Sequence, residues 1–105
     1  MNTYGEGKFR VWLQCEPIGN DLVYILGGGE RSHIGAIVLK IPGKEPEFLK
    51  LDNHYDHIVL EPLAKAASSK YHKKVVAIGG VHVDNASQEE IDQLVNNCKE
   101  LIKCI

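Results

Sequence analysis

Hydrophobic residues recur at every second position near the start of this chain and at helical spacing beyond residue 56, and this change of period restricts the fold most strongly. Residues 8–16 alternate strictly, which predicts a half-buried strand. The residues on its apolar face are Phe9, Val11, Leu13 and Cys15. Further runs rich in strand-forming residues predict strands at 22–26, 34–41, 47–51 and 74–83. The run 34–41 is apolar on both faces, which favours a central position in a sheet.

The first helical stretch is predicted from about Asp56 to Lys70. Its apolar residues fall on one face, at Val59, Leu63 and either Ala66 or Ala67. Pro62 complicates this helix, because proline lacks the N–H that the helix interior needs. It either opens the main helix at its first position or bends a longer one.

The second helix is predicted to begin after Ser87 and to run to the end of the chain. Ser87 and Glu90 form the capping-box signature of a helix N-terminus. The apolar residues that follow at helical spacing are Ile91, Leu94, Val95, Cys98, Leu101 and Ile102. We therefore expect Cys98 to pack as a small hydrophobic residue.

The predicted order of elements is β-β-β-β-α-β-α. Short connections join the first four strands, which favours an antiparallel meander. The sequence thus predicts an α+β fold in which two helices pack on a mainly antiparallel sheet. A length of 105 residues predicts a single domain, residues 1–105.

Charge and cysteine content restrict the class of protein. The formal net charge of -2 argues against a nucleic-acid-binding protein held by phosphate contacts. No apolar run approaches the length of a membrane span, and residues 1–10 lack the apolar segment of a signal peptide. The three cysteines are odd in number and lack CxxC spacing, which fits a reducing compartment better than a disulfide framework. We expect a cytoplasmic protein.

The densest group of special residues is GGGERSHIGA, residues 27–36. Its three glycines either form a β-hairpin loop or leave bare backbone N–H groups that bind an anion. The segment is not a Walker A loop, because no Lys-Ser or Lys-Thr pair follows, and it is not a dinucleotide-binding GxGxxG, because a strand follows. Glu30 and Arg31 are also compatible with ordinary solvated loop residues. His33 fits a half-buried structural residue and a site residue equally well.

A second polar group stands at the end of the last predicted strand. His82 and Asp84 share a face by the period of two, directly before the capped helix. Ligands favour the carboxyl ends of strands, and a helix N-terminus offers free N–H groups to an anion. Asp84 repels such an anion unless a metal or a basic partner lies between them. The alternative is that Asp84 and Asn85 are turn and capping residues and that His82 is structural.

A third polar group, DNHYDH, lies in the loop before the first predicted helix. It contains His54, Asp56 and His57, and Asn or Asp at this position commonly caps a helix. If they converge, four side chains from the three groups suffice to ligate zinc or another divalent metal. These are His33, His54, His82 and Asp84. No tight spacing such as HExxH supports a metal site.

Three segments in this order resemble a known family: GGERSHIGA (28–36), His54 with Asp56, and VHVDNAS with EEI (81–91). Together they are similar to the small D-type subunit of phenolic-acid decarboxylase systems of the gallate or vanillate type, also called prenylated-flavin chaperone-like proteins. The matching residues are Gly28, Gly29, Glu30, Arg31, His33 and Gly35 in the first motif, His54 and Asp56 in the second, and His82, Asp84 and Asn85 in the third. The sequence departs from the family at Ser32, where proline is expected, and at Asp52-Asn53, where Pro-Gly is expected before His54.

The resemblance implies a non-catalytic accessory protein rather than an enzyme. Such a protein assists the large subunit of a UbiD-like decarboxylase that needs prenylated FMN, by binding or delivering prenylated FMN or FMN, or by stabilising the large subunit. The implied fold is that of proteasome-assembly chaperones, a small sandwich that often pairs as a homodimer. The implied flavin-binding residues are Gly28, Gly29, Glu30, Arg31, His33, His54, His82, Asp84 and Asn85.

Two other functions remain open on the residues alone. One is a dimerising assembly or interaction module without a ligand site, in which the outward-facing Trp12 contacts a partner. The other is a small metal-dependent enzyme built on the four metal-ligand candidates above. The 27–36 segment is part of a site only if Arg31 and His33 lie near His82 and Asp84.

Overall fold

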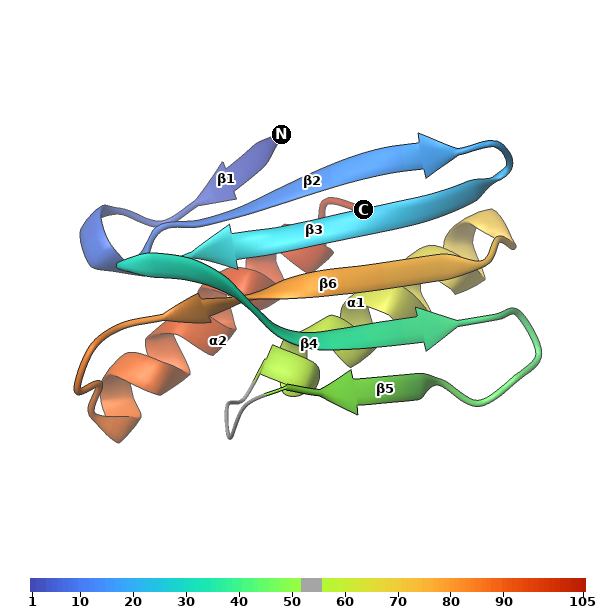
Figure 1. The fold of residues 1–105 in the computed structure, drawn as a ribbon. Helices are drawn as coiled ribbons and strands as arrows, with labels where there is room; N and C mark the ends of the chain where they lie inside the picture. The colour runs from blue at the N-terminus through green and yellow to red at the C-terminus, as the bar shows by residue number, and fades with distance from the viewer. Residues whose placement is uncertain (52–55) are drawn as a thin grey trace.

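The computed structural model describes residues 1–51 and 56–105. Within them, six strands form a single sheet, accompanied by two α-helices and a short 3-10 helix, η1 (Figure 1). In chain order the elements are β1 (Asn2–Tyr4), η1 (Gly7–Phe9), β2 (Val11–Ile18), β3 (Asp21–Gly28), β4 (Arg31–Lys40), β5 (Glu47–Lys50), α1 (Asp56–Tyr71), β6 (Val75–His82) and α2 (Gln88–Ile102). The fold is α+β, as the sequence predicts. The sequence patterns do not indicate β1, whose three residues are all exposed.

The sheet differs from the expected meander because β6 lies between β3 and β4. The strand order is β1-β2-β3-β6-β4-β5, with β6 parallel to β3 and antiparallel to β4. The prediction of a meander is therefore wrong between β3 and β4, and so is the prediction of a hairpin at residues 27–36, whereas β2 with β3 and β4 with β5 pair antiparallel as expected. A short connection keeps the ends of β3 and β4 near each other, but it does not oblige the two strands to pair. Here the connection passes over the end of β6.

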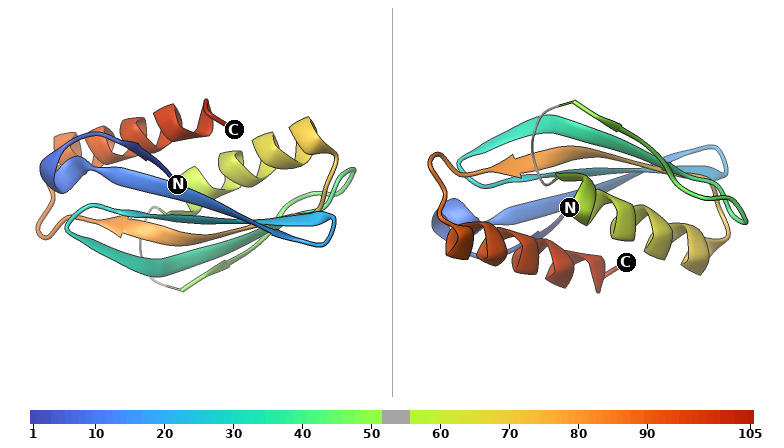
Figure 2. Two further views of the ribbon diagram at one scale, coloured as in Figure 1. Left: turned by 90° about the horizontal axis from the view of Figure 1, so that it is seen from above. Right: turned by 90° about the horizontal axis from the view of Figure 1, so that it is seen from below.

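Both helices pack on one face of the sheet, where the core lies (Figure 2). On that face Tyr24, Ala77 and Val38 stand opposite one another on neighbouring strands, and all three are buried. The buried apolar residues of the helices are Val59, Leu60, Leu63, Ala64 and Ala67 in α1 and Leu94, Cys98 and Leu101 in α2. Cys98 is fully buried, as expected. Its burial, with the charge of Asp56 adding to the effect, raises the pKa of the thiol to about 12.

The N-terminus of α2 is the one that the sequence predicts, and the N-terminus of α1 shows which of the two alternatives for Pro62 is correct. The hydroxyl of Ser87 accepts from the Glu90 N–H at 3.2 Å, and Glu90 Oε1 accepts from the Ser87 N–H at 3.1 Å, which completes the capping box. Pro62 lies inside α1, so the alternative in which it opens the helix is wrong. Neither helix in the described part of the chain is long and apolar enough to cross a membrane.

The opposite face of the sheet carries no helix (Figure 2). Four residues form an apolar row across it, from β3 to the edge strand β5: Ile25, Ile78, Ile37 and Leu49. Leu49 is 56% exposed and the other three are half-buried. Trp12 stands opposite Gly27 on the same face, and a Cβ added to Gly27 would collide with the indole ring. We call this surface the open face.

Candidate functional site

The connection between β3 and β4 crosses the end of β6 at Gly28 and Gly29. Gly29 has a φ of +76°, and an added Cβ would collide with the carbonyl group of His82. Gly28 has a φ of +137°, and its Cβ would stand 2.5 Å from the carbonyl oxygen of Arg10. Residues with a side chain do not fit this conformation and spacing. The two glycines therefore allow the chain to place the following residues directly beside His82.

The N–H groups of this crossing are already used within the protein. The Gly28 N–H donates to Ser32 Oγ at 3.0 Å, and the Gly29 N–H donates to the Arg10 carbonyl at 2.9 Å. The Glu30 N–H donates to the His82 carbonyl at 2.7 Å. The expectation of bare N–H groups that form an anion-binding nest is therefore wrong, because close packing of the backbone satisfies them. An anion bound here must be held by side chains.

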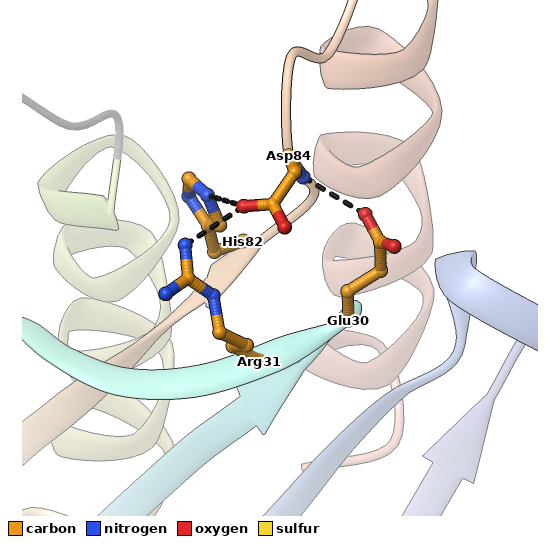
Figure 3. A network of polar contacts seen from close by, with 4 residues as sticks. All are labelled: Glu30, Arg31, His82 and Asp84. Carbon is orange, nitrogen blue, oxygen red and sulfur yellow. Dashed lines mark hydrogen bonds and ion pairs between the residues drawn. The ribbon is translucent and has the colours of Figure 1, made fainter.

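Four charged or polar side chains meet at the crossing, and we call them the Asp84 cluster: Glu30, Arg31, His82 and Asp84 (Figure 3). Arg31 Nη2 donates to Asp84 Oδ1 at 2.7 Å, and His82 Nε2 lies 2.9 Å from the same oxygen. The Asp84 N–H donates to Glu30 Oε1 at 2.8 Å. Two segments about fifty residues apart in the sequence are thus joined side chain to side chain.

The Asp84 cluster is accessible to solvent and holds two carboxylates, Glu30 and Asp84, against the single guanidinium of Arg31. The side chains of Arg31 and Asp84 are 66% and 56% exposed, and that of His82 is 25% exposed. The hydrogen bond with His82, followed by the charge of Arg31, holds the pKa of Asp84 below its usual value. Asp84 is therefore ionised at neutral pH. Exposed ion pairs contribute little to stability, so Arg31 can exchange this carboxylate for another anion at small cost.

His33 and Asp56 form a second, more enclosed pair next to this cluster. His33 Nε2 lies 3.3 Å from Asp56 Oδ2, and the Asp56 side chain is only 3% exposed. The ring of His33 meets that of His82 edge to face, with 6.0 Å between the ring centroids. His33 therefore stands between the buried carboxylate and the exposed cluster.

Asp56 is seated between two glycines at the start of α1. A Cβ added to Gly35 or to Gly80 would collide with its carboxylate. The Val81 N–H donates to Asp56 Oδ1 at 3.0 Å. A helix N-terminus favours a negative charge, and the Val81 hydrogen bond adds to this stabilisation. The absence of side chains at both glycines is what admits a carboxylate into this part of the core.

Two hollows open beside His82. One, of about 260 Å³, is polar and is lined by Arg31, Ser32, His33 and His82. The other, of about 190 Å³, lies where β6 meets α1 and α2. Its lining is mostly apolar and consists of Val59, Val81, Val83, Ala86, Ile91, Leu94 and Val95, with Asp56, His82 and Asn85 as the polar members. His82 lines both hollows.

The structure brings together most of the site residues named from the sequence. Arg31 and His33 lie beside His82 and Asp84, as the site hypothesis requires, and Glu30 joins them. Arg31 is the basic partner that the sequence analysis required next to Asp84. Asn85 turns the chain toward α2 with a φ of +51° and lines the apolar hollow. His54 lies outside the described residues.

The metal alternative gains no support from the part of the chain that the structure describes. Among residues 1–51 and 56–105, no group of three or more His, Cys, Asp or Glu side chains is arranged to hold a metal ion. His33, His82 and Asp84 lie near one another, but Arg31 shares their hollow and pairs with the carboxylate that a metal would need.

Two features of the site are missing from the sequence-based residue set. Asp56 is quoted there as part of a motif but not as a binding residue, although it is the buried carboxylate of the site. The glycines at 35 and 80 were its signal, because a glycine inside a strand often marks the close approach of another group. The apolar hollow had no local signal, since its walls come from three elements.

Comparisons with known proteins agree with the fold and give a family. The family model described as "Prenylated flavin chaperone LpdD-like domain" matches residues 5–105, nearly the whole chain. No curated protein matches the chain significantly. A chain from a crystal structure of a chaperone complex for yeast 20S proteasome assembly is similar in fold, with a TM-score of 0.57 at 11% sequence identity. The match covers 98% of this chain and 92% of that one.

Proposed function

The chain belongs to the family of prenylated flavin chaperones of the LpdD type, and on this premise we propose that it binds prenylated FMN or FMN and supplies it to a UbiD-like aromatic-acid decarboxylase. The protein is proposed to be a non-catalytic, cytoplasmic accessory subunit. The decarboxylation itself takes place in the partner enzyme, where prenylated FMN acts as the cofactor once the enzyme has bound it. The observation that carries the proposal is the meeting of the 28–36 segment with residues 81–85 at the end of β6.

The Asp84 cluster fits the phosphate of such a ligand. Arg31 Nη2 and His82 Nε2 converge on a single oxygen atom, which is the arrangement a phosphate oxygen needs. We propose that Arg31 and His82 exchange the carboxylate of Asp84 for the phosphate. Asp84 then belongs to the site as the group that keeps both donors in place before the ligand arrives.

The remaining residues of the proposed site have supporting roles. Asp56 holds His33 at the wall of the polar hollow, so that its ring faces the ligand in a defined orientation. Gly28 and Gly29 contribute backbone that fits closely against Arg10 and His82. Glu30 fixes the backbone of Asp84, and Asn85 stands at the wall of the apolar hollow. We keep His54 in the proposed set on the family resemblance alone.

An exposed site in which Arg31 is already paired with a carboxylate suits a protein that must release its ligand. A carrier that binds more tightly than its recipient cannot deliver, because transfer follows the difference between the two affinities. Asp84 competes with the phosphate for Arg31, and this competition limits the affinity for the phosphate. When the phosphate leaves, the carboxylate of Asp84 pairs with Arg31 again. The same reasoning disfavours catalysis here, because an active site gains from enclosure and fixed dipoles.

The proposal is tested by titration followed by transfer. FMN and prenylated FMN are titrated into the purified protein and followed by flavin fluorescence and calorimetry. The loaded protein is then mixed with a cofactor-free UbiD-like decarboxylase, and the gain of decarboxylase activity is compared with that from free flavin. We expect saturable binding and faster activation from the loaded protein. Absence of both flavin binding and activation contradicts the proposal.

Substitution of Asp84 by asparagine is expected to tighten FMN binding by about tenfold. The amide keeps the shape of the side chain and removes a charge that repels the phosphate, which at about 4 Å in water is worth on the order of 1 kcal/mol for each pair of unit charges. The control is Asp92→Asn, which removes an exposed carboxylate from α2 and should leave the affinity unchanged. Weaker binding by the Asp84 variant would show that its carboxylate holds the ligand rather than competing with it.

We also propose that two copies of the chain pair through the open face. Its apolar row and Trp12 stay accessible in one copy, which is typical of a surface that another protein covers. Ile37→Lys should convert a dimer of twice 11.7 kDa into a monomer in sedimentation equilibrium. Ile58→Lys changes an exposed isoleucine of α1 and should leave the dimer intact. A monomeric wild-type protein contradicts the pairing.

A further inference from the structure

We propose that the apolar hollow between β6, α1 and α2, which we call the ring pocket, receives the dimethylbenzene edge of the flavin ring system. The hollow is the one of about 190 Å³ described above. This inference rests on the proposed function, because it concerns the same ligand. It adds a second contact region to the Asp84 cluster, which by itself recognises only a phosphate.

The ring pocket interrupts the close packing of the core. Val59, Val83 and Leu94 in its wall are at most 5% exposed, so the hollow reaches into the packed interior. Protein interiors are close-packed, and a void lined by apolar side chains forfeits dispersion contacts. A concave apolar site with a few polar groups at its wall is the usual form of a small-molecule site. The ring pocket has this form, with Asp56, His82 and Asn85 as its polar members.

The volume of the ring pocket selects the part of the ligand that enters. A cavity of roughly 150 Å³ with apolar walls accommodates benzene, so about 190 Å³ accommodates one six-membered ring with small alkyl substituents. Three fused rings do not fit completely. The methyl-bearing benzene ring matches the apolar wall, whereas the pyrimidine ring of a flavin carries N–H and C=O groups that this wall cannot satisfy.

His82 connects the ring pocket with the phosphate site. Its side chain lines both the apolar and the polar hollow, and its Nε2 lies 2.9 Å from Asp84 Oδ1. A ligand with an apolar ring at one end and a phosphate at the other can therefore contact both regions by passing His82. Inorganic phosphate and phosphorylated sugars lack the ring, and riboflavin lacks the phosphate. The two hollows together discriminate in favour of a molecule with both parts.

The test separates the two regions with three probes: FMN, riboflavin and inorganic phosphate. Val95→Phe places a ring of its own in the pocket from α2 and is expected to weaken FMN and riboflavin binding at least tenfold while leaving inorganic phosphate binding unchanged. Ala86→Leu is a second variant that fills the pocket, from the residue directly before the Ser87 cap of α2. Ile102→Phe, at a half-buried position in the last turn of α2 that does not line the ring pocket, is the matched control and should leave all three affinities unchanged.

A readout on the wild-type protein does not depend on any variant folding. Methyl resonances of Val83, Leu94 and Val95 are expected to shift on addition of riboflavin and to stay in place on addition of inorganic phosphate. If FMN binds while these methyl resonances stay in place and Val95→Phe binds FMN as tightly as the wild type, the ring pocket is overturned and the proposed function stands. If the wild-type protein binds none of FMN, prenylated FMN and riboflavin, the ring pocket and the proposed function are both overturned.

Discussion

Gly80→Ala is expected to lower the free energy of unfolding by about 2 to 3 kcal/mol, the upper range for inserting a methyl group into a packed core. The new Cβ would stand 2.7 Å from both Cγ and Oδ2 of Asp56. The carboxylate cannot move away freely, because Val81 and His33 hold it on one side and Gly35 closes the other. The loss is measured by urea denaturation followed by circular dichroism.

The control for Gly80→Ala is Gly19→Ala. Gly19 has a φ of +58° with nothing within 4 Å of an added Cβ, so its substitution costs only backbone strain of about 1 kcal/mol. A double-mutant cycle with Asp56→Ala then isolates the collision, since removal of the carboxylate makes room for the new methyl group. Asp56→Ala should therefore cost less in the Gly80→Ala background than in the wild type. Equal costs in both backgrounds would show that Asp56 does not restrict position 80.

Arg31→Glu is expected to raise the Kd for FMN by about a hundredfold. Loss of a hydrogen bond to a charged group costs roughly 1.5 to 3 kcal/mol, and a carboxylate in its place adds repulsion of about 1 kcal/mol per unit charge pair in water. Riboflavin carries no phosphate, so its affinity should change little. Both ligands are titrated by fluorescence into the same protein preparations.

The matched control for Arg31→Glu is Lys44→Glu. Lys44 lies in the turn between β4 and β5, at the opposite end of the sheet from the Asp84 cluster (Figure 1). Both substitutions change the net charge of the chain by the same amount, so a general electrostatic effect would weaken FMN binding equally in the two variants. Equal losses would remove Arg31 from the phosphate site, and so would an unchanged affinity after Arg31→Glu.

Local sequence pattern was sufficient to predict the elements of this fold except β1 and η1. Alternation identifies β2 near residues 8–16, and the run 34–41 becomes β4. Ser87 and Glu90 mark the beginning of α2, where the structure shows both capping-box hydrogen bonds. These features depend on residues only a few positions apart, so the sequence order alone specifies them. Propensity and period say which conformation a segment adopts, and they say nothing about its neighbours.

The pairing of the strands could not be predicted from local sequence pattern, because it depends on partners far apart in the chain. The short β3–β4 connection favoured a hairpin, yet β6 takes the place between the two strands. Two glycines admit this crossing: Gly29 passes over the end of β6 against His82, and Gly28 packs against Arg10 and Val11, both at distances that no side chain allows. Glycine is equally compatible with a hairpin turn and with such a crossing, so the sequence could not distinguish them.

The candidate site, like the fold, was partly predictable from the sequence and partly dependent on packing between distant segments. Which polar residues stand at the ends of β4 and β6, including Arg31, His33 and His82, could be predicted from the sequence. Packing of distant segments was needed to bring them together, to bury Asp56 against two glycines, and to open an apolar hollow beside them. The physical reason is that charge and period belong to single segments, whereas proximity, burial and empty volume arise only where segments pack together.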